Sequence, residues 1–182
     1  MKRLVVATIV MGFAFGAQAN EGSGFRLGFQ DVKSDLELKG GSVIDTKYNA
    51  DLSGIELGYD FNNVAGVSAT YSKGNGALGD YTDYRIAGEF GYDFNVITDY
   101  LRLKPYGSIG YENVDIASPV NTLTQTPIDV SMNGLSVGLG VRATVMKYGY
   151  VGLETTAMTS NDYGIDTSLV NSRITVGGKY AF

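Results

Sequence analysis

The chain has 182 residues, of which 44% are hydrophobic, 18% charged and 12% aromatic, and its formal net charge is −5. The absence of Cys and His excludes a disulfide scaffold, His or Cys metal sites, and the Ser-His-Asp and Cys-His catalytic arrangements. The low charged and high aromatic fractions are untypical of a disordered chain. Its 25 glycines, about twice the average usage, require a structural reason.

The N-terminus has the three parts of a secretory signal peptide. They are a basic start, an apolar run and a small-residue cleavage box, at Lys2-Arg3, residues 4–15 and Ala17-Gln18-Ala19. We expect cleavage between Ala19 and Asn20, which makes 1–19 the signal peptide and 20–182 the exported domain. The alternative, a membrane anchor, requires about 20 apolar residues, and this run is shorter. The exported chain keeps 12 basic and 19 acidic side chains, so nucleic acid is not expected as a partner.

Eight later segments alternate apolar and polar residues with period two, as β-strands with one apolar face do. They are residues 25–30, 54–61, 65–71, 84–94, 101–111, 135–145, 151–157 and 173–182. Two architectures use this pattern. A soluble lipocalin-like barrel or sandwich buries the apolar face inside, whereas a membrane barrel turns it to lipid. The mean hydropathy of −0.00 is compatible with a membrane barrel, because the lipid face and the polar face average out.

The polar faces of these segments favour the membrane barrel. Besides glycine they carry isolated charges of both signs, and the interior of a small barrel must be filled by side chains. We predict an interior charge network of Arg26, Glu56, Arg85, Glu89, Arg102, Lys104, Arg142, Glu154 and Arg173, with Asp60, Asp93 and Lys179 on the same faces. The alternative is that these are ordinary surface charges.

The connections between segments alternate in length, as in outer-membrane barrels with short periplasmic turns and long external loops. Short turns are expected at Asn62-Asn63, 95–100 and 146–148, and longer polar loops at 34–50, 72–82, 112–133 and 158–171. An even number of strands places both termini on the periplasmic side.

Aromatic residues at the segment ends predict two interfacial girdles. Those near the short turns are Phe25, Phe61, Phe94, Tyr148, Tyr150, Tyr180 and Phe182, and those near the loops are Tyr71, Tyr84 and Tyr111.

The last residues resemble the C-terminal β-signal of bacterial outer-membrane proteins, in which a polar residue, a glycine and two aromatic residues have fixed spacing. Thr175, Gly177, Tyr180 and Phe182 match these four positions. The resemblance implies recognition by the barrel-assembly machinery, for which pairing of a strand edge is the expected mode.

The whole exported chain resembles the small eight-stranded outer-membrane barrels, the group of the OmpA transmembrane domain, OmpX/Ail and related porin-family proteins. This resemblance implies an all-β fold, an eight-stranded antiparallel transmembrane up-and-down β-barrel in the Gram-negative outer membrane.

We expect a non-enzymatic protein without cofactors that has a structural or surface-interaction role through its extracellular loops. A narrow porin-like channel is the alternative, although eight strands normally enclose side chains. The chain also resembles the small barrels that acylate or deacylate lipid A, but these depend on a His that is missing here. The expected partners are outer-membrane lipid and lipopolysaccharide, the assembly machinery and an extracellular ligand, and the chain is expected to be a monomer.

The third loop has a pattern of its own. Val114, Ile116, Ile128, Val130 and Met132 lie on the opposite parity from the lipid faces of the flanking segments. This predicts a hairpin that continues above the membrane with apolar residues turned over the barrel mouth and residues 118–127 at its tip. The alternative is a mobile polar loop.

Removal of Phe182 tests the proposed β-signal. We expect the truncated chain to assemble poorly, because the assembly strand would lose its terminal aromatic residue, and to accumulate in the periplasm. Cell fractionation with immunodetection measures this, and normal surface display of the truncated chain would overturn the role assigned to Phe182.

Overall fold

The structure, a computed structural model, describes residues 22–40, 44–98, 100–117, 129–162 and 165–181. The strands are β1 (Gly24–Gly40), β2 (Ile44–Asp60), β3 (Ala65–Gly76), β4 (Gly79–Gly91), β5 (Phe94–Ile97), β6 (Leu101–Ala117), β7 (Asp129–Val145), β8 (Gly149–Asp162) and β9 (Ile165–Ala181). The described residues contain no helix that is long and apolar enough to cross a membrane.

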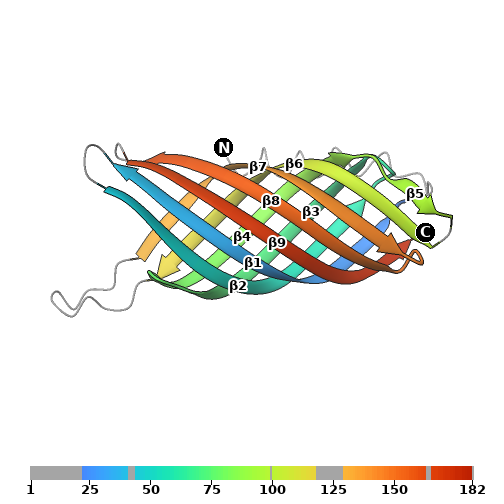
Figure 1. The fold of residues 1–182 in the computed structure, drawn as a ribbon, viewed down its shortest axis with the longest axis horizontal. Coiled ribbons are helices and arrows are strands. Elements are labelled where there is room, and N and C mark those ends of the chain that lie inside the picture. Colours follow the sequence, from blue (N-terminus) through green and yellow to red (C-terminus); the bar gives the residue numbers. More distant parts are fainter. Residues whose placement is uncertain (1–21, 41–43, 99, 118–128, 163–164, 182) are drawn as a thin grey trace, which may run out of the picture.

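The strands form a closed antiparallel barrel (Figure 1). Consecutive long strands are neighbours, β1 pairs with β9, and the pairing of β4 with β6 bypasses the short β5. Eight long strands therefore make up the wall, and β5 lies along β6 at one end. This is the predicted eight-stranded up-and-down barrel. Closure leaves the wall without a free sheet edge, which is what a lipid environment requires.

The apolar faces of the strands point outward. Phe29, Leu135 and Leu139 are 71–76% exposed, and their neighbours Gln30 and Ser136 are buried inside. This orientation confirms the membrane barrel and contradicts the soluble lipocalin-like alternative. We call the outward apolar residues the apolar band; they include Phe25, Leu27, Phe29, Ile55, Leu57, Tyr84, Ile86, Phe90, Ile109, Tyr111, Leu135, Val137, Leu139, Val151, Leu153, Ile174, Val176 and Tyr180.

The long loops expected at 34–50, 72–82, 112–133 and 158–171 extend too far into the strands, because the strands continue beyond the apolar band. β1 and β2 stay paired to Gly40 and Ile44, and β8 and β9 to Asp162 and Ile165. β3 and β4 are separated only by Ala77-Leu78. We call these strand extensions the collar. It begins at Asp31 in β1 and at the register partners of this residue, Ser53 in β2 and Lys73 in β3.

The collar has the reverse polarity of the band. Its outward residues Asp31, Lys33 and Asp35 are exposed, whereas Val32 and Leu36 are buried inside. The inward residues form the apolar plug, which comprises Val32, Leu36, Ala50, Leu52, Tyr81, Val114, Ile116, Met132, Met158 and Leu169. Burial raises the pKa of the Tyr81 hydroxyl. A reversal of this kind suits a barrel that leaves lipid for water, where apolar side chains move to the inside.

The hairpin predicted in the third loop is present. Val114 faces Met132 in the β6–β7 register, and Ile116 faces Val130. Val114, Ile116 and Met132 are each at most 6% exposed and belong to the plug. The side chain of Val130, Ile128 and the tip at 118–127 lie outside what the structure describes.

The short turns lie at the other end of the barrel. Met146 and Lys147 have φ values of 50° and 67°, in the left-handed region, and the Tyr148 N–H donates to the Val145 carbonyl at 3.2 Å, which closes a tight turn. In the first turn, the side-chain oxygen of Asn62 accepts hydrogen bonds from the backbone N–H groups of Val64 and Ala65. The expected turn at 95–100 is partly wrong, because residues up to Ile97 form β5.

The aromatic girdle near the turns needs one correction. Tyr148 and Tyr180 are about 70% exposed on the outer wall, as expected. Tyr150, in contrast, is 2% exposed and points inside, because it alternates with the outward Val151. Phe182 lies outside the described residues.

Candidate functional site

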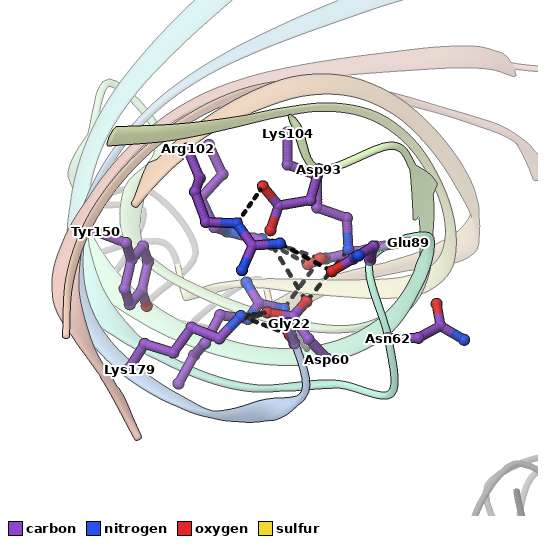
Figure 2. Close-up of polar contacts among 12 residues, drawn as sticks. Gly22, Asp60, Asn62, Glu89, Asp93, Arg102, Lys104, Tyr150 and Lys179 are labelled. Carbon is purple, nitrogen blue, oxygen red and sulfur yellow. Dashed lines mark hydrogen bonds and ion pairs between the residues drawn. The ribbon is translucent and has the colours of Figure 1, made fainter. Parts of the chain in front are cut away.

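The candidate site is the charged interior of the barrel. Each of the nine residues predicted for it lies on an inward position: Arg26, Glu56, Arg85, Glu89, Arg102, Lys104, Arg142, Glu154 and Arg173. Viewed along the barrel, the side chains nearest the turns converge within the ring of strands (Figure 2). They divide into a lower cluster near the turns and an upper cluster beneath the plug.

Glu89 is the centre of the lower cluster. It accepts hydrogen bonds from Arg26 at 2.9 Å and from Arg142 at 3.0 and 2.9 Å. Arg26 also donates to Glu56 at 3.0 Å, and Glu56 accepts from the Tyr150 hydroxyl at 3.1 Å. All four charged side chains are at most 8% exposed. Bonds between ionised partners are stronger than neutral ones, and the fork of an arginine can bind two carboxylates at once.

Asp60 connects the lower cluster to the turn-side opening of the barrel. Its carboxylate accepts from Lys179 at 2.8 Å and from Lys104 at 3.3 Å, and it forms an ion pair with Arg26. Lys179 also donates to the backbone oxygen of Gly22 at 2.8 Å. The first described residues are thereby tied into the turn-side opening (Figure 2).

The upper cluster is organised around two arginines. Arg173 donates to Asp83 at 2.9 Å, to Thr156 at 2.6 Å and also to Glu112. Arg85 donates to Ser108 and Ser136 and pairs with Glu154 at 3.2 Å. The ion pairs of both arginines join strands that are not neighbours in the wall, β9 with β4 and β4 with β8, so the cluster links opposite walls of the barrel.

Two members of this cluster, Glu112 and Asp83, are missing from the predicted network. They are 0% and 2% exposed. Both lie directly beyond the predicted strand segments, in or beside residues assigned to loops. Strand parity could have found them, because Glu112 continues the inward series of Lys104 and Ser108.

Glycines make room for the large interior side chains. A Cβ at Gly58 would lie 2.6 Å from the Arg26 guanidinium carbon, and one at Gly140 would lie 2.5 Å from the Tyr106 ring. The Arg142 guanidinium in turn lies 4.9 Å from the centre of the Tyr106 ring, a cation–π distance. At these positions, the glycine excess reflects the packing of a narrow interior.

The interior is electrically balanced. Within the described residues it contains seven basic side chains, Arg26, Arg85, Arg102, Lys104, Arg142, Arg173 and Lys179, and seven acidic ones, Glu56, Asp60, Asp83, Glu89, Asp93, Glu112 and Glu154. Buried charges are tolerated only when they are paired. Among the described residues, no group of three or more carboxylates is arranged to hold a metal ion.

The other site residues predicted from the sequence belong to the β-signal, which lies at the end of β9, and to the signal-peptide cleavage site. Thr175 points inside at 5% exposure, Gly177 packs beside Tyr150, and Tyr180 is exposed on the outer wall. Phe182 and the expected cleavage site at Ala19 and Asn20 lie outside the described residues.

The sequence of residues 5–182 matches the family described as outer membrane protein β-barrel domain. The chain belongs to this family. The match covers nearly the entire sequence and places the protein in the outer membrane of a Gram-negative cell envelope. A search of curated proteins found no match.

Solved structures of small outer-membrane barrels are similar in fold. OprG from Pseudomonas aeruginosa is 14% identical, with 88% of this chain and 96% of that chain covered and a TM-score of 0.55. Neisserial surface protein A is 13% identical, with 86% and 97% covered and a TM-score of 0.52. Ail of Yersinia pestis is 14% identical, with 85% and 98% covered and a TM-score of 0.51. At these identities the similarity establishes the fold alone.

Substitution of Glu89 by alanine tests the stabilising role of the network. The change leaves Arg26 and Arg142 without their shared buried carboxylate, and we expect a loss of about 3–5 kcal/mol in the free energy of unfolding. Urea-dependent unfolding in lipid vesicles measures it. The control is Asp93→Ala, because its partner Arg102 keeps 19% side-chain exposure and water can solvate it. Equal losses for the two variants would contradict the central role of Glu89.

Proposed function

We propose that this family member is a non-enzymatic structural or surface-interaction protein, a filled barrel that holds a rigid collar outside the membrane. The observation that supports this most strongly is the filling of the interior at two levels. Balanced ion pairs fill the part surrounded by the apolar band, and the apolar plug fills the collar. The plug residue Val32 and the cluster residues Glu89 and Glu112 are at most 2% exposed, so water has little access to either level.

The narrow-channel alternative requires a continuous aqueous path. The charged side chains could in principle line one, but Arg26, Arg142 and Arg173 direct hydrogen bonds to buried carboxylates across the interior. In addition, ten apolar side chains block the collar end. The packed interior therefore favours the interaction role, in keeping with the usual filling of eight-stranded barrels.

The barrel also has a defined orientation in this proposed function. The start of β1 and the end of β9 pair with each other, Gly24 with Ala181, at the end of the barrel that has the short turns. Short turns are periplasmic in outer-membrane barrels. Both termini would then face the periplasm, and the collar would stand in the extracellular space as a monomer available to an extracellular ligand.

Conductance in planar bilayers tests the filled barrel. We expect the purified protein to insert without producing conductance steps, because neither level of the interior provides a water path. A large porin inserted under the same conditions is the positive control for incorporation. Reproducible steps from the wild-type protein would support the channel alternative instead.

Single cysteines test the orientation, since the chain has none of its own. Asp35→Cys lies on the outer face of the collar, and Asn95→Cys lies in the turn-side strand β5; both positions are exposed. We expect a membrane-impermeant maleimide to label Asp35→Cys on intact cells and Asn95→Cys only after lysis. The reverse pattern would overturn the orientation.

A further inference from the structure

The upper cluster carries more acidic than basic groups. The interior as a whole is balanced, but this level holds the carboxyl groups of Asp83, Glu112 and Glu154 against only two guanidinium groups, those of Arg85 and Arg173. Glu154 pairs with Arg85 at 3.2 Å, whereas Asp83 and Glu112 both pair with Arg173. If every group were ionised, the cluster would keep one negative charge without a partner, and a buried charge of this kind is costly.

Asp83 and Glu112 meet at a single nitrogen atom. The Nη2 atom of Arg173 donates to Asp83 Oδ2 at 2.9 Å and also to Glu112 Oε1. The two acidic side chains are 2% and 0% exposed, so bulk water does not screen one carboxyl group from the other. When two carboxyl groups share a buried site, their charges repel each other, and this favours a state in which one of them keeps its proton.

The second oxygen of each carboxyl group is an orphaned acceptor. Asp83 Oδ1 and Glu112 Oε2 are buried without a hydrogen-bond partner among the described residues, and so is Asn171 Oδ1 beside them, whose amide nitrogen donates to Glu112 at 2.6 Å. Arg85 Nε lies 3.9 Å from Glu112 Oε2, which is too far for a hydrogen bond. A proton on either carboxyl group turns one of these acceptors into an O–H donor, and it occupies no volume in a packed interior.

The other strands add no further titrating group around the pair. Burial raises the pKa of the Tyr81 hydroxyl, the next inward group on β4, so it stays neutral. The remaining inward positions are uncharged; they continue the row of Asp83 across β3, β2 and β1 or contact the two arginines from β7 and β8, and they are Ser72, Gly54, Gln30, Ser136 and Thr156.

We propose that Asp83 and Glu112 together bind one proton, and that release of this proton loosens the apolar plug above them. Val114 of the plug is the cross-strand partner of Asp83 in the β4–β6 register. When the proton leaves to bulk water, the added negative charge lies next to Val114. Water can stabilise this charge only by entering between the carboxyl groups and the plug. The pair would thereby make the packing of the collar sensitive to pH, whichever way the barrel is oriented.

Infrared spectroscopy of the folded full-length protein in lipid vesicles tests the shared proton, because a protonated carboxyl group has a carbonyl stretch distinct from that of a carboxylate. At about pH 5, where ordinary Asp and Glu are largely ionised, we expect a protonated carboxyl signal that is lost by about pH 9. Asp83→Asn and Glu112→Gln should each remove it, because Arg173 neutralises the one carboxylate that remains. The matched control Asp93→Asn, an inward acid paired with Arg102 near the turns, should keep the signal. A wild-type spectrum without the signal at about pH 5, or its persistence in both variants, would overturn the shared proton.

A cysteine in the plug tests the second step, since the chain has none of its own. The reaction of Val114→Cys with a small thiol reagent is compared with that of Val114→Cys/Asp83→Asn at each pH, so that ionisation of the thiol affects both proteins. We expect the ratio of the two rates to rise with pH by up to about tenfold per pH unit, the limit for release of one proton. A ratio that stays constant between about pH 5 and about pH 9 would overturn the coupling of the proton to the plug.

Discussion

The structure depends on one constraint, the period-two alternation of strands in a closed wall whose outer solvent is lipid. Because successive side chains point to opposite faces, an apolar outer face leaves every second residue to an interior only one side chain wide. Charges placed there have no bulk water and must neutralise one another. The shared carboxylate of Glu89 and the shared hub of Asp60 follow directly from that requirement.

The part of the barrel within the apolar band could be predicted from the sequence. Lipid contact makes the outer face uniformly apolar, so Leu135, Val137 and Leu139 alternate clearly with Ser136 and Gly138. The same parity identified the interior positions of the nine network residues. Tyr150 shows that parity is more reliable than residue type: its aromatic ring suggested a girdle, whereas its alternation with Val151 places it inside.

The collar could not be predicted in the same way, because its polarity is reversed. Residues 31–40 still alternate, but Val32 and Leu36 have the parity of the polar residues before them. In water an outer face of Asp31, Lys33 and Asp35 resembles a loop in composition. The hairpin of Val114 and Met132 was recognised because both of its sides reverse together, and the same reasoning applied to β1 would have predicted its extension.

The partners within the network are also beyond sequence reasoning. Arg26 on β1 meets Glu89 on β4 and Arg173 on β9 meets Asp83 on β4, across the interior. Such pairs depend on the tilt and stagger of the strands, which bring residues of different rows to one level. Strand parity can show which charged residues face the interior, but only the three-dimensional register shows which atoms meet.

The reversal of polarity also determines how the barrel sits in the bilayer. On β1 the outer face changes from Phe29 to Asp31 within two residues, and on β2 from Ile55 to Ser53. A displacement of one such step into the membrane would bring Asp31 and Lys73 into hydrocarbon, and charges on the lipid face are costly there. A displacement outward would expose the aromatic row to water. The barrel is therefore held at one height in the bilayer.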